Sequence, residues 1–336
     1  QSTSNEVTRS TFTTTPLIGN PMAVEANQRY GQSDLNRLFQ TNTKTDASAS
    51  ANAHANNEED LYEYKRVVEL QSILGNKRKQ SDSTDGSIKT ITSSDFIIDL
   101  HSSNSNVGLV CMISAGANDI TATRIASNLV SKFPSLRVTY STGSKTDSWS
   151  LDSISTSGFA FEVGPVTHGI IDYHLLEQTR DLVCTTLDYI ENRNNCLLEN
   201  IHEEEKSTIE IIKNSNSYNE NVYNFLSKKI EVYIMETYIH FPLRNCCLHP
   251  NLLNKDFSII KPGDDCFITT DGTKTKIPFI YPIELNKDSK DSNSNNSKEI
   301  PIEEQKELYV VFVNEAAYAK RNIAFAVYTK HQKTVF

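Results

Sequence analysis

Two short apolar runs in the sequence carry residues that could do hydrolytic chemistry. Residues 96–100 (Phe-Ile-Ile-Asp-Leu) lead into His101, and Asp99 lies two positions before this histidine. Ligands of an open α/β sheet collect at the carboxyl ends of its strands, so a histidine that ends a strand is well placed to bind a metal ion or a substrate. Asp99 could then orient the imidazole ring. The alternative is a histidine that makes ordinary hydrogen bonds at a strand end.

The second run, residues 159–163 (Phe-Ala-Phe-Glu-Val), contains Glu162 and stops at Gly164-Pro165. A carboxylate within an apolar run is costly to bury without a partner. A general base beside a metal-bound water is one role that would account for such a residue. A structural ion pair is the other.

Two arginines and an asparagine lie within nine residues, at Arg29, Asn36 and Arg37. Guanidinium groups bind carboxylates through paired hydrogen bonds, and an amide can add a further donor. This segment therefore suits the recognition of a substrate carboxylate. Surface salt bridges are the alternative.

The elements that must position these residues alternate between strand and helix. Short apolar runs predict strands at 96–100 and 159–163, and apolar residues at helical spacing predict helices over 61–74, 120–133 and 175–190. This alternation predicts an α/β fold in which helices cover both faces of a largely parallel sheet.

After residue 228 the pattern changes to short strands separated by turns. We therefore expect an α/β domain over residues 1–195, a polar insertion or linker over 196–228 and a β-rich domain over 229–336. The strands of the last domain are predicted at 230–241, 267–270, 277–283, 307–314 and 324–331. Three tracts are polar and of low complexity, so we expect them to be disordered: residues 42–58, 197–227 and 287–300.

Composition excludes several classes of protein. The 336 residues include 33 basic and 42 acidic ones, and a formal net charge of −9 argues against nucleic-acid binding. No apolar run approaches the roughly 18–20 residues of a membrane span. The six cysteines form no repeated C-x-x-C pattern, and we interpret them as reduced thiols of a cytoplasmic protein.

Longer motifs from both parts of the chain occur in the order found in one protein family. They are Asn20-Pro21-x-Ala23-Val24, Arg29-Tyr30, Asp34-Leu35-Asn36-Arg37-Leu38-Phe39, Asp99-Leu100-His101, Glu162-Val163-Gly164-Pro165, His249-Pro250-Asn251-Leu252, Pro262-Gly263-Asp264 and Val313-Asn314-Glu315-Ala316-Ala317-Tyr318. In these motifs the chain resembles the aspartoacylases and related aminoacylases, the succinylglutamate desuccinylase–aspartoacylase branch of the zinc carboxypeptidase superfamily. The resemblance covers nearly everything outside the polar tracts. It implies a carboxypeptidase-like mixed, largely parallel sheet flanked by helices, with the smaller β-rich C-terminal domain covering the active site.

The resemblance also implies a reaction. Members of this family use zinc to cleave N-acyl amino acids to a carboxylate and a free amino acid. By this resemblance His101 would be the third zinc ligand. Glu162 would be the general base that deprotonates the zinc-bound water and then passes the proton to the leaving amine. Arg29 would polarise the acyl carbonyl and stabilise its oxyanion.

The resemblance assigns substrate contacts as well. Asn36 and Arg37 would hold the α-carboxylate, and Tyr318 would reach in from the second domain. In aspartoacylases an arginine shortly before the catalytic glutamate binds the second carboxylate of acetylaspartate. Here Asp152 occupies that position and would repel a second carboxylate. Trp149 would line an apolar pocket, so we expect N-acetyl aromatic or neutral amino acids to be preferred over N-acetylaspartate.

The chain departs from the family pattern in one motif. The first two zinc ligands come as His-x-x-Glu upstream of Asn20-Pro21, and the nineteen residues before Asn20 contain no histidine. We interpret the His-x-x-Glu matches at 174–177 and 202–205 as chance. We therefore expect the chain to be N-terminally incomplete, without its first strand and this motif, and its activity to depend on the missing ligands. A zinc-free relative that binds carboxylates without turnover is the alternative.

The sequence therefore predicts a zinc-dependent amidohydrolase that acts on a small-molecule N-acyl amino acid in the cytoplasm. We expect no nucleic-acid or membrane partner. Whether the chain forms a homo-oligomer stays open.

Overall fold

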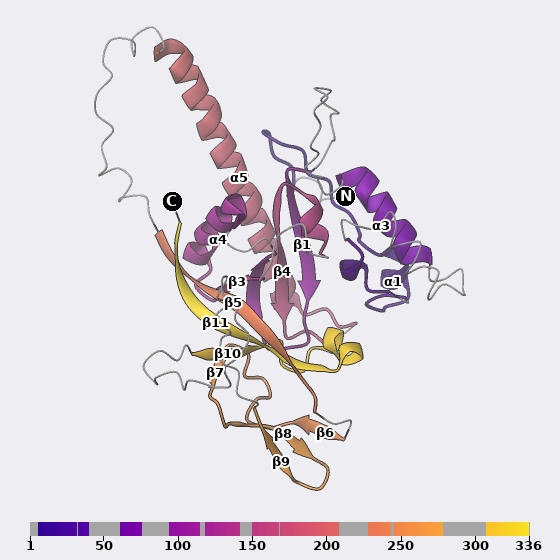
Figure 1. Ribbon diagram of the computed structural model, residues 1–336. Coiled ribbons are helices and arrows are strands. Elements are labelled where there is room, and N and C mark those ends of the chain that lie inside the picture. The colour runs from indigo at the N-terminus through magenta and orange to yellow at the C-terminus, as the bar shows by residue number, and fades with distance from the viewer. Residues whose placement is uncertain are drawn as a thin grey trace, which may run out of the picture.

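Figure 1 shows the computed structural model of the chain. It describes residues 6–31, 33–39, 61–75, 94–114, 118–141, 150–167, 169–207, 228–242, 245–277 and 307–335. Trp149 and the predicted polar tracts at 42–58 and 287–300 lie outside these residues.

An eight-stranded sheet forms the centre of the molecule, with the strand order β1-β4-β2-β3-β5-β11-β10-β7 (Figure 1). In chain order its strands are β1 (Phe96–Ser102), β2 (Gly108–Ile113), β3 (Leu136–Tyr140), β4 (Ser157–Gly164), β5 (Lys228–His240), β7 (Ser258–Ile260), β10 (Leu308–Val311) and β11 (Ile323–Val335). The pairs β1–β4, β2–β3 and β3–β5 are parallel, and the pair β2–β4 is antiparallel. The predicted α/β fold with a mixed sheet is confirmed.

The C-terminal strands continue this sheet. β5 lies beside β3, and β11, β10 and β7 follow it in antiparallel pairs. A second, three-stranded sheet has the order β6-β8-β9, with β6 (Cys246–Leu248), β8 (Asp265–Thr269) and β9 (Lys274–Lys276). The β-rich C-terminal part is confirmed, but its long strands share the first part's sheet. The division into domains at residues 195 and 229 stays a prediction.

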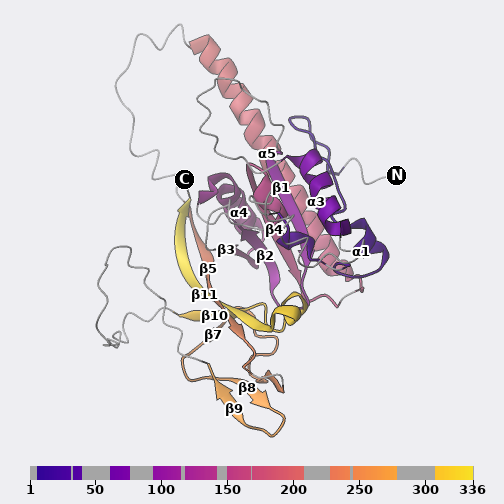
Figure 2. The same ribbon diagram turned by 45° about the vertical axis from the view of Figure 1, so that its right-hand side comes forward.

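Helices cover both faces of the parallel part of the sheet. α4 (Ile120–Lys132) and α5 (Tyr173–Ser207) pack on one face, where Ile125, Leu129 and Leu182 are buried in the main core. α3 (Leu61–Leu74) lies on the other face, and its residue Leu70 packs with Ile97 of β1. Figures 1 and 2 show α3 and α4 on opposite sides of β1 and β4. The elements that complete the N-terminal part are α1 (Pro21–Glu25) and the short 3-10 helices η1 (Leu35–Arg37) and η5 (Leu151–Ile154).

The helix α5 is longer than the sequence pattern predicts. It continues without a break to Ser207, so the predicted disorder of the tract 197–227 is wrong over residues 197–207. The reason is that Leu, Glu and Lys are good helix formers whether or not they are buried. Leu197 and Leu198 are about half exposed there, so the helix continues at these two positions without their full burial. Among the described residues, no helix has both the length and the apolar character needed to cross a membrane.

Candidate active site

The register of β1 and β4 brings His101 and Glu162 together. These strands run parallel, and His101 is paired directly with Glu162 near their carboxyl ends. Because side chains alternate along a strand, Ile97, Asp99 and His101 share one face of the sheet. This is the face covered by α3, η1 and η5. The two residues predicted to do the chemistry are therefore neighbours.

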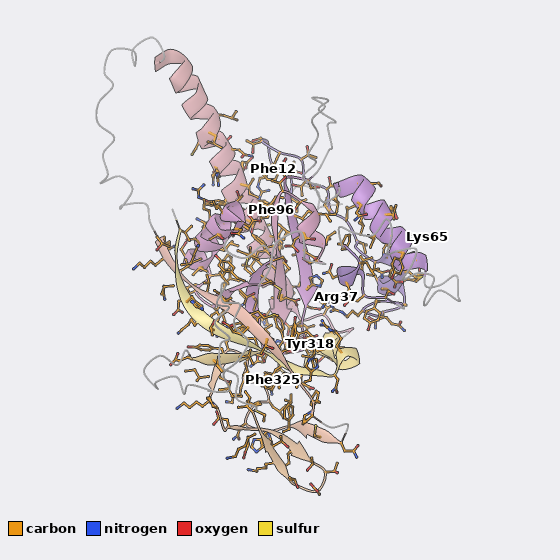
Figure 3. All side chains as sticks on the ribbon, in the orientation of Figure 1. Phe12, Arg37, Lys65, Phe96, Tyr318 and Phe325 are labelled. Atoms are coloured by element: carbon orange, nitrogen blue, oxygen red, sulfur yellow. The ribbon has the colours of Figure 1, made fainter. Side chains whose placement is uncertain are left out.

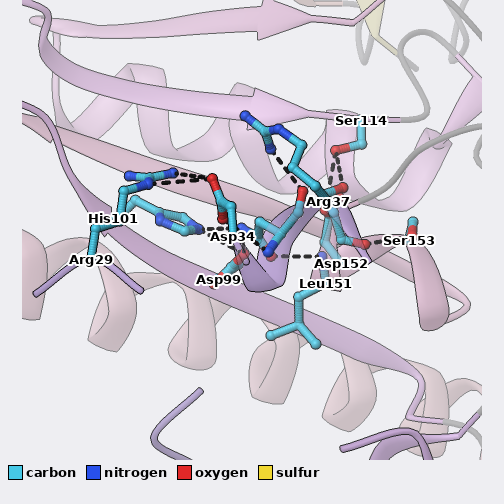
Figure 4. Close-up of polar contacts among 11 residues, drawn as sticks. Arg29, Asp34, Arg37, Asp99, His101, Ser114, Leu151, Asp152 and Ser153 are labelled. Carbon is cyan, nitrogen blue, oxygen red and sulfur yellow. Dashed lines mark hydrogen bonds and ion pairs between the residues drawn. The ribbon is translucent and has the colours of Figure 1, made fainter. Parts of the chain in front are cut away.

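A network of hydrogen bonds holds the His101 ring. Its Nε2 atom lies 2.8 Å from Asp99 Oδ2 and 2.7 Å from Asn36 Nδ2 (Figure 4). Asn36 Nδ2 also donates to Asp99 Oδ2 at 2.9 Å, and the backbone N–H of Leu151 donates to Asn36 Oδ1 at 3.3 Å. One amide thus ties η1 to β1 and to η5. Asp99 contacts the ring, and its orienting role stays a prediction.

Charges in this network shift the pKa values of its members. Burial alone would lower the pKa of His101, but the charge of Asp99 and its hydrogen bond, together with the charge of Glu162, raise it to about 9. Burial raises the pKa of Asp99, but His101 and Asn36 outweigh burial, and the pKa is lowered. Asp99 thus favours the protonated form of His101, and His101 favours the ionised form of Asp99.

Glu162 differs from Asp99 in having no such partner. Burial raises its pKa and the charge of Glu315 adds to the rise, while the charges of His101 and Arg29 act in the opposite direction without cancelling it. No described residue donates a hydrogen bond to its carboxylate. The raised pKa makes this carboxylate a stronger base than an ordinary glutamate.

Arg29 lies on the loop before η1, and Arg37 is the last residue of η1. Arg29 donates to Asp34 Oδ2 at 3.3 Å, and its charge acts on both His101 and Glu162. Arg37 donates through Nη1 to the backbone oxygen of Asn36 at 2.7 Å. The structure thus places Arg29, Asn36 and Arg37 on one loop beside the paired strands.

Asp152 lies beneath this loop. Only 1% of its surface is exposed, and its Oδ1 accepts a hydrogen bond of 3.1 Å from Ser114 Oγ (Figure 4). A direct contact between Asp152 and a substrate is therefore not available in this arrangement. An effect of its charge on a substrate stays a prediction, as does the role of Trp149, which lies outside the described residues.

Tyr318 approaches the same strand ends from the C-terminal part. It belongs to the 3-10 helix η8 (Ala316–Arg321), and its ring packs against those of Tyr238 at 5.4 Å and Phe312 at 6.1 Å between centroids. Burial raises the pKa of its phenol, and the charges of Tyr238, Tyr328 and Glu162 add to the rise. Figure 3 labels Arg37 and Tyr318, both toward the carboxyl ends of β1 and β4.

Three residues that interact with Glu162 or Tyr318 were not predicted as site residues. Glu315 and Tyr328 both interact electrostatically with Glu162, and Tyr238 interacts with Tyr318. Glu315 lies within a motif shared with the family, which was a signal that it mattered. Tyr238 and Tyr328 lie on the long strands β5 and β11, and aromatic residues are common in any strand, so the sequence held no signal for them.

The described residues do not by themselves fit a metal ion. No three of their His, Cys, Asp or Glu side chains are grouped so as to hold one. His101 could supply one ligand after losing a proton, whereas zinc sites use three or four protein ligands. His174 and Glu177 lie on the exposed first turns of α5, where Glu177 pairs with Arg180 at 3.4 Å.

Several known proteins are similar to this chain over most of its length. Probable aspartoacylase of Nostoc sp. is 26% identical to the chain over 97% of this chain and 87% of its own length. Human N-acyl-aromatic-L-amino acid amidohydrolase (carboxylate-forming) is 26% identical over 98% of this chain and 83% of its own length. The crystal structure of murine aminoacylase 3 has the same fold, with a TM-score of 0.68 and 23% identity over 98% of this chain and 88% of that one.

The catalytic region is matched by a family model as well. Residues 1–190, more than half of the chain, match the succinylglutamate desuccinylase/aspartoacylase catalytic domain. This stretch includes His101, Glu162 and the loop with Arg29, Asn36 and Arg37. The predicted family and the predicted fold class are thereby confirmed: the chain belongs to the succinylglutamate desuccinylase/aspartoacylase family.

Proposed function

We propose that this chain hydrolyses the amide bond of N-acyl amino acids and releases a carboxylate and a free amino acid. The observation that carries the proposal is the direct pairing of His101 with Glu162, with Arg29 close enough for its charge to act on both. The curated relatives named above, an aspartoacylase and an aromatic amino acid amidohydrolase, support this class of reaction.

Glu162 is the general base in this proposal. Its raised pKa suits a group that takes a proton from water and then gives it to the leaving amine. Arg29 supplies positive charge near the acyl oxygen, where negative charge develops during attack. Its present partner, Asp34 at 3.3 Å, is a half-buried carboxylate that a substrate would have to displace or share.

Arg37 is the residue that we propose to bind the substrate α-carboxylate. One of its N–H groups donates to the Asn36 oxygen, and a guanidinium has five in total. Asn36 can share this role only by giving up a contact, because its amide already donates to Asp99 and lies against His101. The main task of Asn36 in this proposal is to hold His101 and Asp99 in place.

We further propose that the active protein carries zinc. His101 would be one ligand, and the remaining ligands would come from outside the described residues. Zinc at such a site lowers the pKa of a bound water to about 7. We also propose a preference for aromatic or neutral N-acetyl amino acids, because the buried charge of Asp152 disfavours a second substrate carboxylate.

The experiment that tests the proposal combines metal analysis with an assay. Full-length protein would be analysed for zinc and incubated with N-acetyl-L-phenylalanine and N-acetyl-L-aspartate, with the released amino acid quantified. We expect zinc in the protein and faster release of phenylalanine. Failure to hydrolyse either compound after addition of zinc would refute the proposal.

A matched variant tests the substrate preference separately. Asp152→Asn keeps the size of the side chain and an acceptor for Ser114, but it removes the charge. The ratio of kcat/KM for acetylaspartate to that for acetylphenylalanine should rise. An unchanged ratio would show that Asp152 does not set the preference.

A second candidate function is a metal-free protein that binds carboxylates without turnover. It is favoured by the lack of a metal-binding group among the described residues. Calorimetry separates the candidates, because such a protein would bind N-acetyl amino acids with a stable heat signal, no released product and no zinc.

A further inference from the structure

The loop that follows His101 bonds to the C-terminal part of the chain through successive side chains. This loop, residues 103–107, links β1 to β2. Ser103 Oγ and Ser105 Oγ both donate to the carboxylate of Glu315. Asn106 Nδ2 donates to a backbone oxygen in the turn before β7, at 2.9 Å. The loop thus joins the strand that carries His101 to segments more than 140 residues away.

Asn104 makes the contact that reaches η8. Its Nδ2 donates to the backbone oxygen of Asn314 at 2.8 Å, and its Oδ1 accepts from the backbone N–H of Ala316 at 2.7 Å. Ala316 is the first residue of η8, and Asn314 has a left-handed backbone with φ of 58°. The Asn104 amide therefore bonds to the residue two positions before the helix and to the first residue of the helix.

The same loop is also bonded to the strand that carries Glu162. The backbone N–H of Ser103 donates to the oxygen of Val163 at 2.9 Å, and that of Val166 donates back to Ser103 at 2.7 Å. A side chain at Gly164 would not fit, because a Cβ there would lie 2.5 Å from the Ser103 oxygen. Hydrogen bonds consequently connect this loop both to the segment around β4, which carries Glu162, and to the start of η8.

From these contacts we infer that Asn104 is a positioning residue: its amide holds the first turn of η8 and so sets where Tyr318 stands relative to Glu162. Tyr318 lies two residues after Ala316. The Asn104 side chain is exposed, so packing does not require an asparagine at this position. What the contact requires is a donor and an acceptor in one short side chain, and an amide provides both at once. The inference rests on the proposed function in that Tyr318 is taken to contact the substrate.

A double-mutant cycle tests whether Asn104 acts through Tyr318. The variants are Asn104→Ala, Tyr318→Phe and the double variant, each in full-length protein, with N-acetyl-L-phenylalanine as substrate. We expect Asn104→Ala to raise KM by about 3–10-fold, the equivalent of one lost hydrogen bond, while kcat changes by less than about twofold. In the Tyr318→Phe background the same substitution should change KM by less than about 1.5-fold, because groups that act together are not additive.

Asn106→Ala is the matched control. It removes an exposed amide from the same loop, but its partner is the oxygen of Asn254 and not the start of η8. We expect its KM to equal that of the unmodified protein. If Asn104→Ala and Tyr318→Phe have additive effects on KM, or if Asn106→Ala raises KM as much as Asn104→Ala does, the inference is wrong.

A spectroscopic measurement keeps this test separate from the proposed function. A 3-fluorotyrosine at position 318 gives a single ¹⁹F signal whether or not the protein has activity. Asn104→Ala should shift or broaden this signal, and Asn106→Ala should leave it unchanged. If the unmodified protein hydrolyses no N-acyl amino acid but the signal still responds in this way, the proposed function fails and the positioning role stands. An unchanged signal in Asn104→Ala refutes the positioning role.

Discussion

At the scale of single residues, the proposed chemistry depends on the contrast between Asp99 and Glu162. Both carboxylates lie on one face of the paired strands β1 and β4. Asp99 is bonded to His101 and Asn36, which stabilise its charged form. Glu162 is desolvated without such bonds, and its pKa is raised. The surroundings thus favour the ionised form of Asp99 and the protonated form of Glu162.

Replacing Glu162 by glutamine tests the base directly. Glu162→Gln keeps the shape of the side chain and removes its ability to take a proton. Because a positioned general base contributes a factor of about 10²–10⁴ to a rate, kcat should fall by that amount while substrate binding persists. Steady-state kinetics and calorimetry would measure both. Glu231→Gln, an exposed glutamate of β5, is the control and should keep full activity.

The acid limb of the pH–rate profile should reflect the raised pKa of Glu162. A general base works only when it is ionised, so kcat/KM should fall as the pH drops through this pKa, which lies above the ordinary value of 4.5. Glu315 contributes to the rise through its charge. The variant Glu315→Gln should therefore move the acid limb to lower pH. An acid limb that keeps its pH, or that moves to higher pH, would contradict this account of the site.

At the scale of elements, the sequence predicted the strands and helices that carry the site, but not how they meet. The apolar runs at 96–100 and 159–163 were sufficient to predict β1 and β4. Their register, which opposes His101 to Glu162, depends on pairing between segments about 60 residues apart, and periodicity contains no information on that. For the same reason β11 was predicted as a strand, but its place between β5 and β10 was not.

The sequence pattern also did not predict that Glu63 is buried. Glu63 in α3 has none of its surface exposed, and its Oε1 accepts from the backbone N–H of Gly31 at 2.7 Å. Its Oε2 has no hydrogen-bond partner among the described residues. Glu63 thereby holds the loop that carries Arg29. A glutamate in a helix is ordinarily exposed, so nothing in the sequence distinguished this one from Glu69.

Two substitutions of Glu63 should separate the effect of its hydrogen bond with Gly31 from the effect of its carboxylate. Glu63→Ala leaves the Gly31 N–H without its acceptor and should lower the free energy of unfolding by about 1–3 kcal/mol. It should also raise KM, because the loop with Arg29 loses its anchor. Glu63→Gln keeps an acceptor and removes a buried charge, so its stability should equal or exceed that of the unmodified protein.

Urea unfolding and steady-state kinetics would check both variants. Glu69→Ala is the control on the same helix. Glu69 is exposed and pairs with Arg66 at 2.7 Å, and its loss should cost less than about 1 kcal/mol. Equal losses of stability for Glu63→Ala and Glu69→Ala would argue against the anchoring role.

At the scale of the whole molecule, the continuous sheet joins the two parts of the chain. β3 from the first part pairs with β5 from the second, and Val232 of β5 is buried among residues of α4 and β3. A core shared in this way leaves no boundary at which the parts could unfold independently. We therefore expect them to unfold together.

Unfolding followed by two probes would measure this coupling. Far-UV circular dichroism reports on all strands and helices, and near-UV circular dichroism reports on the packing of buried aromatic side chains such as Tyr140 and Tyr328. The two midpoints in urea should coincide. Val232→Ala, which removes buried methyl groups, should shift both midpoints together by an amount equivalent to about 2 kcal/mol. Val68→Ala, at an exposed position of α3, should shift neither, and two separate transitions would contradict a shared core.

The position of β11 has a consequence for how the chain is made. β11 (Ile323–Val335) follows the other described strands in sequence, yet it lies inside the sheet between β5 and β10. During synthesis the facing edges of β5 and β10 cannot be bridged until residue 335 has left the ribosomal exit tunnel. A nascent chain halted before residue 323 would present two unpaired strand edges, the kind of surface that aggregates and that chaperones bind.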